Sequence, residues 1–393
     1  MKKIKYPLVQ YPYSKKDINE GRKVLSAGKM ITMNKITQKF EKKFSKYLGV
    51  KYSLMVNSGS SANLLALFCI INPMFKKKVK KGDECIIPVI CWSTSLWPIV
   101  QAGLKPKFVD VDLKTFNIDL EDLKKKITKK TKAVLAVHVL GNSTNMNELK
   151  KIINKKRLIL VEDTCESLGS KYANKKLGSF GRFGTFSFFV SHQISAGEGG
   201  MIVCNDYEDY KIIHSLRAHG WDRGLNTSKK NNFNFINSGF NLRPTDITAA
   251  IGLNQFKRLI KMINNRSTNR RKIIQSIKSS KNWRNQIEFL NPTKKVTPSW
   301  FGLPILINKT FLKRKQKFLN HLNKQGIETR PIISGNFLNQ PVSRLYNLNK
   351  NKEKFKNADE IEKRGFFIGL HANKIDQNSV KLLTKNLLMI DRL

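Results

Sequence analysis

Between residues 50 and 205, the sequence alternates short apolar segments with longer segments of helical character. A short apolar segment suits a buried strand, and the longer segments suit the crossover helices that parallel strands require. The pattern therefore predicts an α/β domain with a mostly parallel, seven-stranded sheet. The expected strands are Ser53–Val56, Glu84–Pro88, Lys107–Val111, Ala133–Val139, Leu158–Val161, Thr185–Phe188 and Gly200–Cys204. The expected helices between them are Ser61–Ile71, Ser93–Ala102, Leu120–Ile127 and Met146–Ile153.

The remainder of the chain follows a different pattern. A long pattern over Ile247–Ile277, which predicts one or two helices with Thr245 or Asp246 as the cap, is expected to bridge two domains. Beyond it, strands and helices mix in a way that indicates a smaller α+β domain. Its expected elements are Gly302–Ile307, Phe311–Gln325, Phe366–Leu370 and Gln377–Ile390. We expect a large domain over residues 1–260, which begins with an arm over 1–30, and a small domain over 261–393.

The net charge bears on the partners of the protein. The chain of 393 residues has 73 Lys and Arg against 28 Asp and Glu, which gives a formal charge of +45. These basic residues are spread along the whole chain without a long basic arm, which favours a composition bias over a dedicated nucleic-acid surface. We expect no nucleic-acid partner, although a positive field would attract an anionic substrate. A catalytically inactive basic scaffold, or a nucleic-acid-binding protein of this fold, stays open as an alternative.

The cysteines and the apolar segments bear on the compartment. The five cysteines show no tight spacing and no CxxC motif, which favours reduced thiols and argues against a metal site. No apolar stretch is long enough for a membrane span, and the first 30 residues lack the apolar region of a signal peptide. We expect a cytoplasmic protein with no membrane partner.

Two expected strand ends carry residues that suit cofactor chemistry. The segment Asn57–Ala62 places serines and a glycine between a strand and a helix, where backbone N–H groups can bind a phosphate. The segment Val161–Thr164 ends a strand with an acidic pair, and one carboxylate there can face a protonated heterocyclic nitrogen. Either segment can equally be an ordinary helix cap.

The segment Thr185–Gly200 is more specific, because it resembles a motif of the DegT/StrS-type sugar aminotransferases. These are pyridoxal-phosphate (PLP) enzymes of fold type I that act on nucleotide-linked keto sugars. They place a Schiff-base lysine five residues after the serine of a Ser-Phe pair and five residues before Gly-Glu-Gly-Gly. Here the serine is Ser187, the glycine-rich run is Gly197–Gly200, and the lysine position is His192.

His192 changes the chemistry that the resemblance implies. A histidine cannot form the Schiff base, but it can act as a general base and acid. The same exchange marks a branch of the family that the chain resembles more closely, the pyridoxamine-phosphate (PMP)-dependent 3-dehydratases of nucleotide-linked 4-keto-6-deoxyhexoses. The colitose-pathway type of this branch makes 3-deoxy sugars for surface polysaccharide. Further matching segments are Val56–Leu67, Cys91–Pro98, Phe240–Leu253, Gly326–Pro341 and Asn357–His371.

The resemblance implies roles for individual residues around the cofactor. Asp163 matches the aspartate that keeps the pyridine nitrogen protonated. Trp92 matches an aromatic residue over the ring face, and Glu166 matches a polar residue near the ring. The implied phosphate ligands are Gly59, Ser60 and Ser187.

Other residues are implied to contact a partner subunit or the substrate. Asn241 or Arg243 matches a part of the family that reaches the cofactor phosphate of a neighbouring subunit, which implies a homodimer with shared active sites. His219, Arg243, Arg330 and Asn336 are candidate substrate contacts.

The implied reaction uses PMP and a nucleotide-diphosphate sugar. His192 removes a proton from the C4′ carbon of the cofactor, the C3 hydroxyl of the sugar leaves, and an amino donor such as glutamate restores the amine form of the cofactor. No cysteine cluster suits an iron–sulfur centre, so we expect none. The alternative within the family is an aminotransferase that uses another lysine, such as Lys171, Lys175 or Lys176, although none of these keeps the two five-residue spacings.

Overall fold

The computed structural model describes residues 4–10, 12–225 and 233–393 and has the expected α/β fold. Its large sheet has seven strands in the order β1-β9-β8-β5-β4-β2-β3. All neighbouring strands are parallel except β9, which is antiparallel to both β1 and β8. The strands are β1 (Tyr52–Val56), β2 (Glu84–Pro88), β3 (Lys105–Val109), β4 (Thr131–Val137), β5 (Ile159–Asp163), β8 (Phe183–Ser187) and β9 (Gly200–Cys204). The expected strand bounds were wrong by at most two residues at either end, because an apolar pattern does not mark where strand pairing stops.

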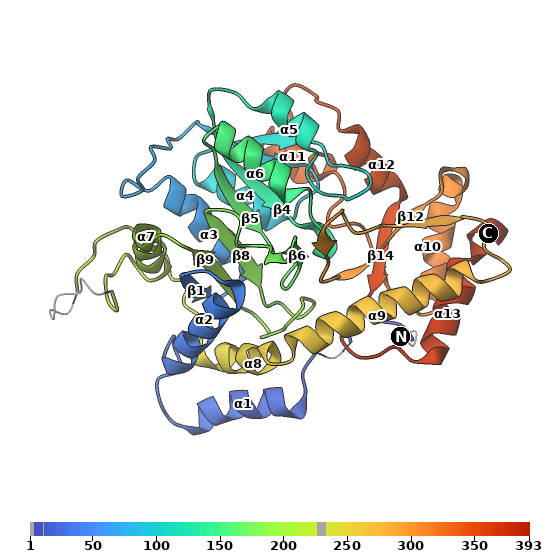
Figure 1. Cartoon of the computed structure of the whole chain (residues 1–393), viewed down its shortest axis with the longest axis horizontal. Helices are drawn as coiled ribbons and strands as arrows, with labels where there is room; N and C mark the ends of the chain where they lie inside the picture. Colours follow the sequence, from blue (N-terminus) through green and yellow to red (C-terminus); the bar gives the residue numbers. More distant parts are fainter. Residues whose placement is uncertain (1–3, 11, 226–232) are drawn as a thin grey trace.

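Helices cover both faces of this sheet (Figure 1). One face packs against α3, α4 and α7, and the other packs against α2, α5, α6 and α8. Successive residues of β1 alternate between the two faces: Leu54 and Val56 enter one core cluster, and Met55 enters another. The helices are α1 (Lys15–Ser26), α2 (Lys35–Leu48), α3 (Gly59–Ile70), α4 (Ser93–Gln101), α5 (Leu120–Lys126), α6 (Met146–Lys155), α7 (Tyr207–Arg217) and α8 (Asp246–Phe256).

The predicted N-terminal arm contains helix α1, which was not predicted from the sequence, and helix α2 follows beyond it. Helix α1 begins with a reciprocal cap between Ser14 and Asp17 and packs against α8. Helix α2 was also missed, although Phe40, Phe44 and Leu48 lie four residues apart and are all buried. The segment before α1 lies against the C-terminal part of the chain, because Tyr6 forms a β-bridge with Ile327.

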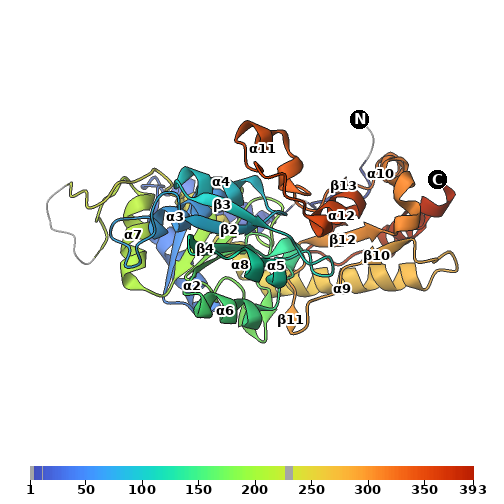
Figure 2. The same ribbon diagram turned by 90° about the horizontal axis from the view of Figure 1, so that it is seen from above.

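The predicted bridge is two helices, α8 and the long helix α9 (Leu259–Lys278), and Thr245 caps the first of them. Figure 2 shows α9 extending beneath a second, four-stranded antiparallel sheet of order β10-β12-β14-β13. The expected helix Phe311–Gln325 is divided into a short 3-10 helix, Lys309–Arg314, and α10. The remaining elements are β10 (Ile287–Phe289), β12 (Gly302–Ile307), α10 (Lys315–Lys324), β13 (Thr329–Arg330), α11 (Pro341–Leu345), α12 (Lys356–Arg364), β14 (Gly365–Gly369) and α13 (Gln377–Leu387).

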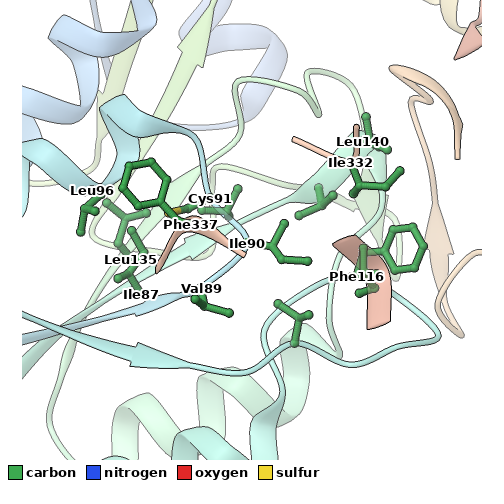
Figure 3. Packing of buried hydrophobic residues seen from close by; sticks show 14 of the residues in the cluster. Ile87, Val89, Ile90, Cys91, Leu96, Phe116, Leu135, Leu140, Ile332 and Phe337 are labelled. Carbon is green, nitrogen blue, oxygen red and sulfur yellow. The ribbon is translucent and has the colours of Figure 1, made fainter. Parts of the chain in front are cut away.

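The C-terminal part is joined to the end of β2 by both apolar packing and hydrogen bonds. Figure 3 shows Ile332 and Phe337 within the buried cluster that contains Ile90 and Cys91. The backbone N–H of Phe337 donates to the carbonyl of Val89 (3.0 Å). This packing holds the C-terminal part against the carboxyl end of β2. The division at residue 260/261 stays a prediction.

A third sheet, separate from the seven-stranded and four-stranded sheets, has three strands in the order β11-β6-β7. It is built from β6 (Lys171–Tyr172), β7 (Lys175–Lys176) and β11 (Val296–Thr297). Within the part of the chain that the structure describes, no helix is both long and apolar enough to cross a membrane. The same residues include no group of three or more His, Cys, Asp or Glu side chains arranged to hold a metal ion.

Candidate active site

The parallel strands end at one edge of the sheet and bring most of the predicted residues to it. Asn57 and Gly59 follow β1, Trp92 follows β2, Asp163 ends β5, and Ser187 ends β8. In open α/β sheets, ligands bind at this carboxyl edge. The edge is therefore the candidate active site.

Asp163 is held in place by three hydrogen bonds. Its Oδ2 accepts from the Nδ2 of Asn63 (2.8 Å) and from the hydroxyl of Ser95 (2.7 Å), and its Oδ1 accepts from the backbone N–H of Cys165 (3.1 Å). The hydroxyl of Thr185 donates to the amide oxygen of Asn63 (2.6 Å), which orients the amide. These bonds suit an ionised carboxylate that faces a cationic ring nitrogen. Asn63 and Ser95 were not predicted from the sequence, where an Asn within an apolar helix was the available signal.

The other member of the acidic pair, Glu162, lies on the opposite face of β5, because neighbouring strand residues alternate. Its carboxylate accepts from the backbone N–H groups of Gly178, Phe180 and Gly181 at 2.6 to 2.9 Å. The Nε2 of His138 also lies 3.0 Å from it. Glu162 thus fixes the loop before β8, and Asp163 is left as the carboxylate at the sheet edge.

Gly59 and Ser187 meet at the N-terminus of α3. A Cβ atom on Gly59 would lie 2.6 Å from the Cβ of Ser187 and 2.9 Å from the sulfur of Cys165, so a larger residue does not fit there. Ser58 caps the helix, and its hydroxyl accepts from the N–H of Ser61 (3.1 Å). A helix N-terminus with close backbone approach and a nearby hydroxyl fits a phosphate. These residues therefore fit the phosphate of a PLP-type cofactor.

His192 lies in the turn after β8, where its backbone N–H donates to the carbonyl of Phe189 (3.0 Å). Its ring lies near the rings of Phe189 and Phe301, with centroid distances of 6.2 and 5.3 Å. The Nδ1 atom is shielded from solvent and has no hydrogen-bond partner among the described residues. Burial lowers the pKa of His192 to about 4, so the imidazole is neutral near pH 7 and can accept a proton.

Glu166 is partly buried beside Asp163, and its Oε2 accepts from the backbone N–H of Leu140 (2.8 Å). Burial, with a smaller contribution from the charge of Asp163, raises the pKa of Glu166 to about 7, although the hydrogen bond from Leu140 acts in the opposite direction. The side chain is thus partly protonated near neutral pH. A protonated carboxyl can donate a hydrogen bond, which an ionised one cannot.

Glu166→Gln should remove a pH dependence of the stability of the cofactor-free protein. The unfolded carboxyl titrates near 4.5 and the folded one near 7, so the folded state binds the proton more tightly. The stability contribution is therefore complete below about pH 4.5 and is lost as the pH rises through about 7, by about 3 kcal/mol. Urea unfolding of both proteins at about pH 5 and about pH 8 measures the difference. An equal pH dependence in the two proteins would contradict the raised pKa.

The remaining predicted residues differ in their surroundings. Asn336 has its amide engaged elsewhere, since it donates to Asp359 (2.8 Å) and accepts from the N–H of Leu338 (3.1 Å). Arg243 donates to Asn241 (2.9 Å) and lines a separate cavity. Exposed residues among the predicted set are Trp92, His219, Asn241 and Arg330. Ser60 donates to the hydroxyl of Thr94 (2.9 Å) within the site. Their functional roles stay predictions.

The fold and this sheet edge define the class of protein, a PLP-dependent transferase of fold type I. The model of the DegT/DnrJ/EryC1/StrS aminotransferase family matches residues 13–385. The chain belongs to this family.

Particular relatives are more informative than the family as a whole. The chain is 39% identical over 383 residues to GDP-4-keto-6-deoxy-D-mannose 3-dehydratase of Escherichia coli O55:H7, which covers 94% of this chain and 96% of the relative. It is also similar to a solved E. coli GDP-4-keto-6-deoxy-D-mannose-3-dehydratase with bound hydrated PLP, with a TM-score of 0.89 and 38% identity over 98% of this chain and all of that one. A solved structure of GDP-4-keto-6-deoxymannose-3-dehydratase with a trapped PLP-glutamate geminal diamine has a TM-score of 0.87 and 37% identity, over 97% and 100% of the two chains.

Proposed function

We propose that this protein is a PMP/PLP-dependent 3-dehydratase of a GDP-linked 4-keto-6-deoxyhexose, which makes a 3-deoxy sugar for surface polysaccharide. The observation that carries the proposal is His192, a neutral and shielded imidazole at the position of the family's Schiff-base lysine. Its similarity to named dehydratases over nearly the whole chain supports the same reaction.

The residues of the site have separate tasks in this reaction. When bound, PMP supplies the amine that condenses with the sugar ketone and a ring that accepts electrons. Asp163 holds the proton on the ring nitrogen, and Gly59, Ser60 and Ser187 hold the phosphate. With cofactor and sugar bound, His192 would be the residue that accepts a proton from the cofactor side and delivers one to the C3 hydroxyl, which would leave as water. A low pKa suits the second task, because the imidazolium gives up its proton readily.

We also propose a cytoplasmic homodimer with shared active sites, with glutamate as the amino donor. Large apolar residues near the segments predicted to reach the neighbouring subunit are exposed: Met30 by 67%, Phe233 by 71% and Phe235 by 58%. Exposed apolar residues of this size support a protein–protein interface. The glutamate adduct in a similar solved structure supports the donor. Five free thiols support a reducing compartment.

The structure weakens the alternative of a relocated Schiff-base lysine. The three candidate lysines belong to the β6–β7 hairpin, not to the carboxyl edge of the large sheet. The Lys175 ammonium lies over the ring of Phe180 (4.7 Å) and that of Lys176 lies over the ring of Tyr47 (4.6 Å). Neither ring belongs to the site around Asp163 and His192.

Two measurements on the purified protein test the proposed function. Incubation with PMP and GDP-4-keto-6-deoxymannose should yield the 3-deoxy sugar nucleotide, identified by mass spectrometry as a loss of oxygen at C3. Borohydride reduction of the PLP-loaded protein should give no pyridoxyl-lysine peptide. A single modified lysine together with an aminated sugar product would instead establish the aminotransferase alternative.

A further inference from the structure

A groove of about 820 Å³ lies between α5, α6 and the small sheet β11-β6-β7. Figure 1 shows α5 and α6 side by side. None of the residues that line the groove belongs to the candidate active site. The proposed reaction therefore gives this groove no role.

The lining of the groove is more basic than the composition of the chain explains. Lysines make up six of its thirteen residues, whereas Lys and Arg together make up 73 of the 393 residues of the chain. The acidic residue of the lining, Glu148, is already paired with Lys124 (2.8 Å). The other five lysines form no ion pair in the part of the chain that the structure describes: Lys151, Lys155, Lys156, Lys294 and Lys295.

These unpaired lysines lie on two walls of the groove. Lys151 and Lys155 are one turn apart on α6 and share one face of the helix, a spacing at which like charges repel each other. Lys294 and Lys295 line the groove from the turn before β11. An anionic ligand between the walls would relieve the repulsion on both.

Hydrogen bonds fix the walls in place. The hydroxyl of Tyr172 donates to the side-chain oxygen of Asn145 (2.6 Å), which joins β6 to the start of α6. The backbone N–H of Ala173 donates to the carbonyl of Lys295 (2.9 Å), which joins the β6–β7 turn to the turn before β11. A groove with fixed walls loses little conformational freedom when a ligand binds.

The groove also presents apolar surface, which narrows the class of ligand. Ile127, Ile152 and Tyr172 line it together with the lysines. A ligand that matches both features carries carboxylates and apolar side chains. A flat lipid surface does not fit a concave groove. Nucleic-acid sites commonly add Arg and exposed aromatic rings, whereas the described lining contains no Arg and its one aromatic residue, Tyr172, is buried.

We propose that this groove binds an acidic, amphipathic helical segment of another protein. Carboxylates one turn apart on such a helix are spaced by about 6 Å along its axis, as Lys151 and Lys155 are on α6. Its apolar face would pack against Ile127, Ile152 and Tyr172, in the manner of a helix bound in a groove.

A fluorescein-labelled peptide in which leucines recur every three or four residues among glutamates tests the proposal. Fluorescence anisotropy should show that it binds the purified protein, and the same peptide with serine in place of leucine should bind at least about threefold more weakly. The triple variant Lys151→Gln, Lys155→Gln and Lys294→Gln should weaken binding roughly tenfold, since each exposed ion pair contributes about two- to threefold. Its elimination activity should stay unchanged, which also shows that the variant is folded.

A second triple variant is the matched control, with substitutions in the C-terminal part: Lys313→Gln, Lys324→Gln and Lys381→Gln. These lysines are exposed and do not line the groove, and their loss lowers the net charge equally. The control should bind the peptide as the unmodified protein does. Equal weakening in both variants would show a general attraction to the positive protein and would overturn the proposal, as would a peptide that does not bind.

The same pair of variants separates the other classes of partner. Phosphatidylglycerol vesicles and single-stranded RNA should bind both variants alike. If the groove variant alone loses binding to either of them, the groove belongs to a membrane or a nucleic acid and the proposal is wrong.

Discussion

His192→Lys is expected to abolish water elimination and to produce a lysine–PLP Schiff base. The lysine amine would be protonated or bound to the cofactor, so the neutral base that His192 supplies near pH 7 would be lost. General acid–base catalysis contributes about 10²- to 10⁴-fold, and the elimination rate should fall by about that factor. Single-turnover elimination measures the loss, and borohydride trapping with peptide mass spectrometry measures the gain of pyridoxyl-lysine at position 192.

His192→Asn is the matched control, because it removes the base without supplying an amine. It should lose elimination to a similar degree but give no pyridoxyl-lysine. Unchanged elimination in either variant would exclude His192 as the base. Loss of elimination in His192→Lys without an adduct would show that the site cannot hold the lysine in the family's geometry.

Asp163→Asn is expected to lower the elimination rate by about 10²- to 10³-fold, the scale of losing one preorganised electrostatic group. The charge that holds the proton on the ring nitrogen would disappear. The amide NH₂ would also face a donor, because Asn63, Ser95 and Cys165 all donate to the present carboxylate. Two donors facing each other should lower the free energy of unfolding by about 1–3 kcal/mol, the cost of one unsatisfied buried polar group. The elimination rate and the absorbance spectrum of bound PLP measure the loss of the charge, and thermal unfolding measures the loss of stability.

Ser95→Ala provides the comparison, since it removes one donor and leaves the carboxylate with Asn63 and Cys165. Its elimination rate should stay within about tenfold of that of the unmodified protein, the cost of about one hydrogen bond to a charged group. An Asp163→Asn protein that retains its elimination rate would contradict the assigned role of Asp163. Thermal unfolding of each variant separates a loss of fold from a loss of chemistry.

The sequence predicted the sheet well because its signal is local. A buried strand shows itself as a short apolar run, and five of the seven strand bounds differ from the structure while all seven strands exist. The cap at Thr245 was equally visible. Helix α1 was missed because it has few apolar residues, and its buried residues are only Asp17, Gly21 and Val24. It is stabilised by packing on α8, more than 200 residues away in the chain.

The candidate site shows the same difference between local features and contacts that are distant in the sequence. The amino-acid sequence by itself determined the chemical groups and the motif that carries them: a histidine where the family has a lysine, an aspartate at a strand end, and a serine-rich turn before a helix. Only the tertiary structure decided what surrounds them. Asn63 reaches Asp163 across 100 residues of chain, and Arg266 reaches the carbonyl of His192 across 74. The physical reason is that sequence periodicity describes contacts within a few residues, whereas these contacts depend on strand order and on how the C-terminal part packs over the sheet.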